Sequence, residues 1–279
     1  MKTDYINIWG LDISTSALSV KELTYLTNLP ESLPALEWVW HEMDRVWEDL
    51  GLNNKKPLLY QPITEFYRHP VWLMNGLFSA LDPLSVQHRE AIAFYISTLN
   101  ASIVADYGGG FGELALRIAQ KSPDTKINVI EPYPSQLGKE RIKKEPRISY
   151  VSKLGVDYDA VVAQDVLEHV EDPIGLAYAI SSSLHHGGLG IFANAFYPVI
   201  KCHLPANFYL RDSFPGVMRA MGMRFVGYVK DAPHALVFEH TGELNLSLAR
   251  LAEQFFKLYF LFNNNLRKIG STLKRITLR

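Results

Sequence analysis

The sequence predicts an α/β protein built on one mostly parallel β-sheet, and two observations carry this prediction. Between residues 100 and 242, short apolar segments alternate with helical segments, which is the pattern of parallel strands joined by crossover helices. This region closes with two apolar segments, 223–229 and 234–239, which are separated by a short loop and predict an antiparallel hairpin at the sheet edge. We therefore expect a seven-stranded sheet, flanked by helical regions at residues 1–99 and 243–279.

The predicted strands and helices follow from local patterns. The first five strands are expected at 102–107, 126–131, 148–151, 160–163 and 189–194. Glu113 to Lys121 is the clearest crossover helix because its apolar residues recur at helical spacing.

The two flanking regions differ from the core. Residues 1–99 read as helices interrupted by prolines, with the clearest segments at 35–50 and 88–99. Residues 243–279 predict an amphipathic helix with a basic end. We expect this helix to pack on its own domain, and contact with a membrane surface is the alternative.

Composition narrows the classes of partner and location. The 279 residues are 48% hydrophobic and 20% charged, as in ordinary folded proteins. The 28 Lys and Arg residues balance 29 Asp and Glu residues, so no global field favours nucleic acid. A single cysteine, Cys202, excludes an intrachain disulfide framework. No signal sequence and no apolar run of about 18 residues are visible, so we expect a cytoplasmic protein without a transmembrane segment.

A glycine loop follows the first core strand. Asp106 and Tyr107 lead into Gly108, Gly109, Gly110, Phe111 and Gly112, and then into a helix. Ligands of open α/β sheets bind at the carboxyl ends of the strands, and glycine lets the backbone approach a ligand closely. Glu131 ends the next strand, so its carboxylate is expected on the same rim, where it can bind the hydroxyls of a ribose. Together these features predict a nucleoside-containing ligand.

These residues resemble a known motif. Asp106 to Gly112 is similar to the first motif of class I S-adenosylmethionine-dependent methyltransferases, and Glu131 matches their ribose-binding acid. Residues 158–173 resemble the fourth-strand motif of the small-molecule subgroup related to quinone-biosynthesis methyltransferases. The resemblance implies a Rossmann-like fold, S-adenosylmethionine as cofactor, and Gln164 and Asp165 beside the transferred methyl group. It also implies a later helix that reaches Leu184 and a turn at residues 185–188 before the fifth strand. The acid that this family often places near the adenine is missing, so residues 152–154 are the segment expected there.

Two histidines are candidate bases for methyl transfer to a hydroxyl. His169 follows the fourth strand, and His203 lies in the loop after the fifth strand. Either could act as a general base, orient a loop or be solvated. We expect no metal, because adjacent Glu168 and His169 would point apart on a helix.

The acceptor pocket is expected beneath residues 1–99. Tyr67, His69 and Trp72 lie in an aromatic and basic segment, and Tyr197 lies in the loop after the fifth strand. These four are candidate acceptor contacts, although aromatic packing between helix and core explains the segment equally well.

The sequence therefore predicts methyl transfer to an oxygen or nitrogen of a small molecule such as a sugar or a secondary metabolite. A nicotinamide-dependent oxidoreductase and a non-enzymatic cofactor-binding or membrane-surface adaptor are the alternatives. The oxidoreductase fingerprint places its third glycine one position later than Gly112.

Overall fold

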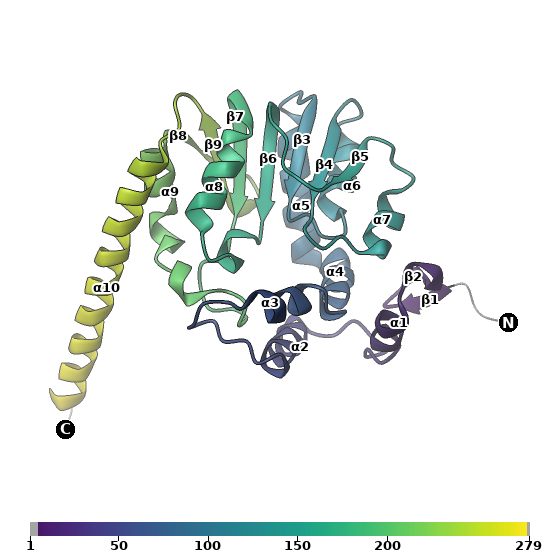
Figure 1. Ribbon diagram of the computed structural model, residues 1–279, viewed down its shortest axis with the longest axis horizontal. Helices are drawn as coiled ribbons and strands as arrows, with labels where there is room; N and C mark the ends of the chain where they lie inside the picture. Colours follow the sequence, from purple (N-terminus) through teal and green to yellow (C-terminus); the bar gives the residue numbers. More distant parts are fainter. Residues whose placement is uncertain (1–4, 278–279) are drawn as a thin grey trace.

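A computed structural model of the chain describes the backbone of residues 5–277 and the side chains of residues 5–262 (Figure 1). Its centre is a seven-stranded sheet in the order β5-β4-β3-β6-β7-β9-β8. The strands are β3 (Ile103–Tyr107), β4 (Lys126–Ile130), β5 (Ile148–Val151), β6 (Tyr158–Gln164), β7 (Leu184–Ala193), β8 (Met223–Val229) and β9 (Ala232–His240). Neighbouring strands from β5 to β7 are parallel, whereas β9 is antiparallel to both β7 and β8. The predicted sheet and its closing hairpin are confirmed.

Helices cover both faces of the sheet (Figure 1). The helices of this part are α5 (Pro83–Ser97), α6 (Glu113–Lys121), α7 (Gln136–Ile142), α8 (Pro173–Ser182), α9 (Leu210–Met221) and α10 (Leu246–Thr277). Alternate residues of each buried strand face opposite sides, so Val162 packs with α5 and α6 while Val161 packs with α8 and α9. Two separate apolar cores therefore hold the sheet between its helical layers.

The N-terminal region lies against the carboxyl ends of the parallel strands (Figure 1). It contains β1 (Tyr5–Ile8), β2 (Leu11–Ser14), α1 (Val20–Thr27), α2 (Leu36–Asp49), α3 (Tyr60–Tyr67) and α4 (Val71–Leu81). The antiparallel hairpin β1–β2 was not predicted, because two strands of four residues outside the strand-helix alternation of the core are hard to distinguish from loop. The α5 helix begins five residues before the predicted position 88, because Asp82 caps it and Pro83 occupies its first turn.

Two predicted boundaries near the sheet edge are wrong. Residues 185–188 are a bulge within β7 and not a turn before it, because Leu184 already pairs with Tyr158 on β6. The loop between β8 and β9 is a tighter turn than expected, and Asp231 has a positive φ of 65° there. Within the described residues, no helix is long and apolar enough to span a membrane.

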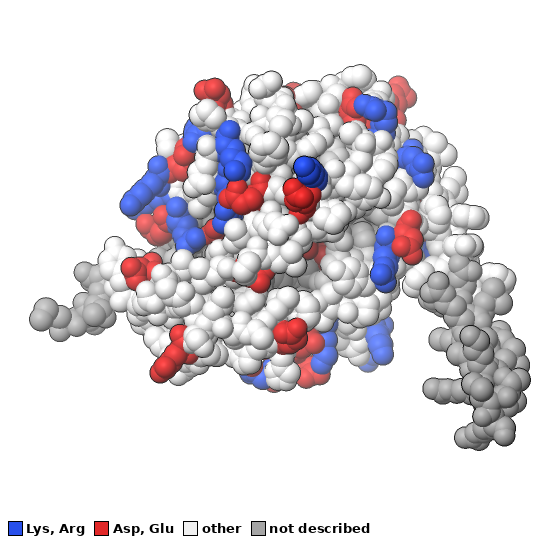
Figure 2. Space-filling view, turned by 180° about the vertical axis from the view of Figure 1, so that it is seen from behind, with Lys and Arg blue, Asp and Glu red and all other residues white. Residues whose placement is uncertain are grey.

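The surface carries charges of both signs. On the face seen in Figure 2, basic and acidic residues lie side by side over the body of the protein. This arrangement agrees with the balanced composition and gives no single-sign surface for nucleic acid on that face.

Candidate functional site

A cavity of about 900 Å³ opens between the carboxyl ends of the parallel strands and the N-terminal helices. Residues of the glycine loop, the segment after β4, the segment after β6 and the loop after β7 line it. Parts of α2 and the segment from Tyr67 to Ser79 line its opposite side. The cavity therefore collects segments that lie more than 100 residues apart in the sequence.

The glycine loop bends sharply at the edge of the sheet. Gly110 has a φ of +50° and faces open space, so an added Cβ would be strained and would project into the cavity. An added Cβ at Gly109 would lie 2.5 Å from Asp106 Oδ2. The loop thus brings backbone to the wall of the cavity.

Asp106 is buried at the end of β3, and its Oδ2 atom has no hydrogen-bond partner. Burial raises the pKa of its carboxyl from 3.8 to about 7, and the charge of Arg89 counteracts part of this rise. A buried polar atom without a partner is costly, and the residue that carries this atom is one of those that line the cavity. Asp106 Oδ2 therefore fits a ligand group that brings a positive charge or a hydrogen-bond donor.

Glu131 directly follows β4, which is the strand next to β3. Its Oε2 atom accepts a hydrogen bond of 3.1 Å from the Gly110 amide, and its Oε1 atom accepts one of 3.1 Å from the Tyr133 amide. Burial raises the pKa of Glu131. The carboxylate is held in place by backbone and still lines the cavity, so it retains accepting capacity for a ligand hydroxyl.

Gln164 ends β6 and Asp165 follows it at the cavity wall. Asp165 has a φ of +53°, which is uncommon for a residue with a side chain, and its amide donates to the Ala193 carbonyl at 2.7 Å. Such strained positions cluster at binding and catalytic sites because the surrounding structure must hold them.

His169 and His203 meet at one side of the cavity, with ring centroids 4.9 Å apart. The Nδ1 atom of His169 lies 3.1 Å from the Cys202 carbonyl, and Nδ1 of His203 lies 3.0 Å from the Tyr197 carbonyl. Because a carbonyl only accepts, each Nδ1 carries the proton and each Nε2 keeps its lone pair.

Both histidines are neutral at pH 7. Burial lowers the pKa of His169 to about 3, and it also lowers the pKa of His203. The site therefore holds two imidazoles whose free nitrogens can accept a hydrogen bond or a proton.

The structure contradicts the prediction that Glu168 and His169 point apart. Glu168 and His169 lie on a short 3-10 turn, Leu167–His169, and not on an α-helix. Their ligating atoms and one of His203 lie within 4.8 Å of one another, so the expectation that they point apart is wrong. Glu168 Oε1 accepts from the Ala195 amide at 2.8 Å, Oε2 has no partner, and burial raises its pKa to about 8.

The predicted acceptor contacts all line the cavity. The ring of Tyr67 stacks on Tyr133 with centroids 6.1 Å apart and also contacts Trp72 at 5.2 Å. The indole nitrogen of Trp72 is buried without a partner. His69 Nδ1 accepts from the Val71 amide, and burial lowers the pKa of His69 to about 4. Tyr197 is 44% exposed on the far side of the cavity.

Among the lining residues that were not predicted are Arg89 and Tyr133, and one predicted segment does not line the cavity. Arg89 on α5 reaches the cavity, with one guanidinium nitrogen donating to the Ser79 carbonyl at 2.7 Å. Tyr133 follows Glu131 and carries Arg68 over its ring at 5.3 Å. Residues 152–154, expected near the adenine, are not among the lining residues, whereas residues 131–136 are. A basic residue on a helix and a tyrosine in a loop carry no sequence signal of their own.

A sheet of this order, with a glycine loop after its first parallel strand and an acid after the next, defines a class I S-adenosylmethionine-dependent methyltransferase. Comparison with known families agrees, because residues 86–213 match the model of a family described as a methyltransferase domain. The chain is thus an S-adenosylmethionine-dependent methyltransferase. A nicotinamide-dependent oxidoreductase is not favoured, and a relation to the quinone-biosynthesis subgroup stays a prediction.

Solved structures agree on the fold. An O-methyltransferase family protein from Burkholderia thailandensis is 15% identical, with a TM-score of 0.53 over 86% of this chain and 80% of that protein. Human N-acetylserotonin methyltransferase, solved in complex with SAM, is 18% identical, with a TM-score of 0.52 over 80% of this chain and 70% of that protein. No curated protein sequence matches the chain.

Proposed function

We propose that this enzyme transfers the methyl group of S-adenosylmethionine to an oxygen atom of a small, flat acceptor. The observation that carries the proposal is the pair of neutral histidines in the same cavity as the glycine loop. A hydroxyl acceptor loses a proton as it is methylated, and a positioned imidazole nitrogen is a suitable base for that proton.

The residues around the glycine loop fit the cofactor. Asp106 Oδ2, buried and without a partner, suits its amino group, and Glu131 suits its ribose hydroxyls. Arg89 also lines the cavity, and its guanidinium group suits the carboxylate of the cofactor. Bound S-adenosylmethionine supplies an electrophilic methyl group, so these contacts serve to place it and to exclude water.

His203 is the better of the two candidate bases. A general base works best with a pKa near the working pH, and burial moves the pKa of His169 to about 3. The pKa of His203 is lowered as well, but the carbonyl of Tyr197 and the charge of Asp165 oppose the effect of burial. We assign His203 Nε2 to hold the proton of the acceptor hydroxyl and His169 to position the neighbouring ring.

The acceptor is expected to be flat and aromatic. Tyr67 and Trp72 offer ring surfaces to the cavity, and the free indole N–H of Trp72 can donate to an acceptor oxygen. The helices that carry these residues, within the region 1–99, would then act as the acceptor-binding cap.

Matched acceptor pairs test the proposal. Purified enzyme with S-adenosylmethionine is offered flat aromatic alcohols and the corresponding amines, such as 2-naphthol and 2-naphthylamine, and methylated products are measured by mass spectrometry. Methylation of the alcohol in preference to the amine is expected. Preference for the amine would contradict transfer to oxygen, while the binding of S-adenosylhomocysteine, measured by calorimetry, would test the cofactor site independently.

A further inference from the structure

The α10 helix has two apolar faces, of which only one is covered by the protein. Ala249 is buried, and Phe256 and Phe260 pack against the core that contains α8 and α9. On the other face, apolar side chains recur at intervals of three and four residues and are each more than half exposed. These are Leu248, Leu251, Phe255, Leu258 and Phe262. We call them the free stripe of α10.

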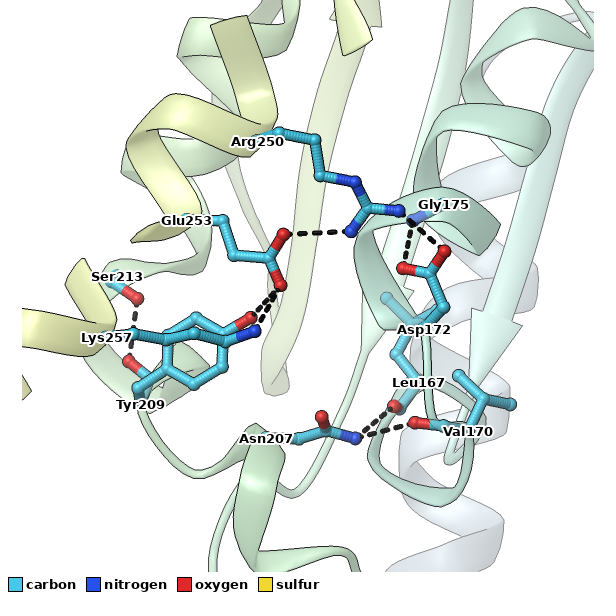
Figure 3. A network of polar contacts seen from close by, with 10 residues as sticks. All are labelled: Leu167, Val170, Asp172, Gly175, Asn207, Tyr209, Ser213, Arg250, Glu253 and Lys257. Carbon is cyan, nitrogen blue, oxygen red and sulfur yellow. Dashed lines mark hydrogen bonds and ion pairs between the residues drawn. The ribbon is translucent and has the colours of Figure 1, made fainter. Parts of the chain in front are cut away.

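The base of α10 is fixed to the body by a polar network (Figure 3). Arg250 pairs with Asp172 at 2.6 Å and with Glu253 at 2.8 Å, while Lys257 pairs with Glu253 at 2.8 Å. The Tyr209 hydroxyl donates to the same Glu253 carboxylate at 2.7 Å. These contacts fix the rotation of α10 about its own axis. The free stripe therefore faces away from the body.

The expectation that the terminal helix packs on its own domain is thus only half correct. Figure 1 shows α10 extending beyond the body, with its far end on the side of the molecule where α2 and α3 cap the sheet. The side chains beyond residue 262, including the predicted basic end, lie outside the described residues. The sequence nevertheless continues the spacing of the free stripe at Leu266, Ile269, Leu273 and Ile276.

Charge decides between the partners that could cover the free stripe. After Glu253 the sequence contains no acidic residue and six basic ones, namely Lys257, Arg267, Lys268, Lys274, Arg275 and Arg279. Two copies packed through this stripe would bring like charges together, and the nearest carboxylate, Glu253, is already shared by three partners. An anionic lipid surface suits both the free stripe and the basic end of α10, because it buries apolar side chains and attracts Lys and Arg.

We propose that the free stripe and basic end of α10 bind the surface of an anionic membrane, with the helix lying in the plane of the lipid headgroups.

Flotation with lipid vesicles tests the proposal on the full chain. Vesicles of phosphatidylcholine alone are compared with vesicles containing about 30 mol% phosphatidylglycerol, because cationic segments respond to anionic lipid. Binding is expected to the anionic vesicles, to be much weaker to phosphatidylcholine, and to fall as salt is raised to about 0.5 M. Absence of binding to anionic vesicles would overturn the proposal.

A pair of surface variants tests whether binding depends on the free stripe or on any exposed apolar side chain. The variant Phe255→Glu/Leu258→Glu is expected to reduce the bound fraction about tenfold or more, because it places charge in the buried part of the interface. The control is Phe94→Glu on α5, since Phe94 and Phe255 are each 64% exposed. Wild-type binding by the stripe variant, with unchanged melting temperature, would contradict the proposal.

A second pair of variants separates the basic end from total charge. The test variant replaces four basic residues by glutamine: Arg267, Lys268, Lys274 and Arg275. The control replaces four exposed lysines of the body: Lys55, Lys56, Lys126 and Lys230. Only the test variant is expected to lose binding to anionic vesicles. Sedimentation of the vesicle-free wild type as a dimer that Phe255→Glu/Leu258→Glu converts to a monomer would show instead that a second copy covers the stripe.

Discussion

The amide of Gly110 donates a hydrogen bond of 3.1 Å to Glu131, and so connects the glycine loop after β3 to the acid after β4. The two residues lie 21 positions apart in the sequence, but they follow the carboxyl ends of adjacent parallel strands. Because the carboxylate orders the loop, the two parts of the proposed cofactor site form one unit. A change at Glu131 should therefore affect both the ribose contact and the loop.

Glu131→Ala is expected to weaken binding of S-adenosylhomocysteine by about 1–3 kcal/mol, because charge-assisted hydrogen bonds are lost. Glu131→Gln keeps one accepting oxygen for the Gly110 amide and should lose less. Isothermal titration calorimetry measures both variants, with Asp124→Ala as a control remote from the cavity. Full affinity in a folded Glu131→Ala protein would refute the ribose assignment.

Affinity for S-adenosylhomocysteine should depend on pH through Asp106. The pKa of the free enzyme's Asp106 is about 7, and a cationic amino group beside it favours the ionised carboxylate. Affinity should thus be highest above pH 7 and fall by up to about tenfold per pH unit below it. Calorimetry from pH 5.5 to 8.5 checks this, and Asp106→Asn should abolish the dependence. A slope retained in Asp106→Asn would assign the titration to another group.

The same residue should limit the stability of the cofactor-free protein. The folded state raises the pKa of Asp106 from 3.8 to about 7, so it binds a proton that the unfolded chain has lost between these pH values. Stability falls as pH rises through this window, by at most about 4 kcal/mol from this group. Asp106→Asn should therefore melt higher than wild type at pH 8, with the difference vanishing near pH 4. An equal or lower melting temperature at pH 8 would show that the buried carboxylate carries no such penalty.

The two histidines should differ in the pH at which their rings titrate and in how far their substitution lowers kcat. By NMR, the ring of His169 should stay neutral down to pH 5, since its pKa is lowered to about 3. With an alcohol that the enzyme methylates as acceptor, His203→Ala should lower kcat by about 10²–10⁴. His169→Asn keeps a donor for the Cys202 carbonyl and should retain most of the activity that His169→Ala loses. A larger loss of kcat in His169→Asn than in His203→Ala would reverse the two roles.

The sheet, the glycine loop and the position of Glu131 were predictable because they depend on local pattern and on topology. Short apolar segments mark the central strands, and parallel strands place their carboxyl ends on one edge. Asp106, the glycine loop and Glu131 follow directly from that rule. The short strands β1 and β2 escaped detection because they lie outside the alternation of strands and helices that indicated the equally short β5.

The sequence alone determined the fold class, the loop and the acid that faces it, since each depends on residues close together in the chain or on adjacent strands. Only the tertiary structure decided how Glu168, His169 and His203 converge, because a 3-10 turn and a distant loop set those directions. It also decided which face of α10 stays uncovered. Periodicity shows that a helix has apolar faces, but which of them is buried depends on the elements packed against it.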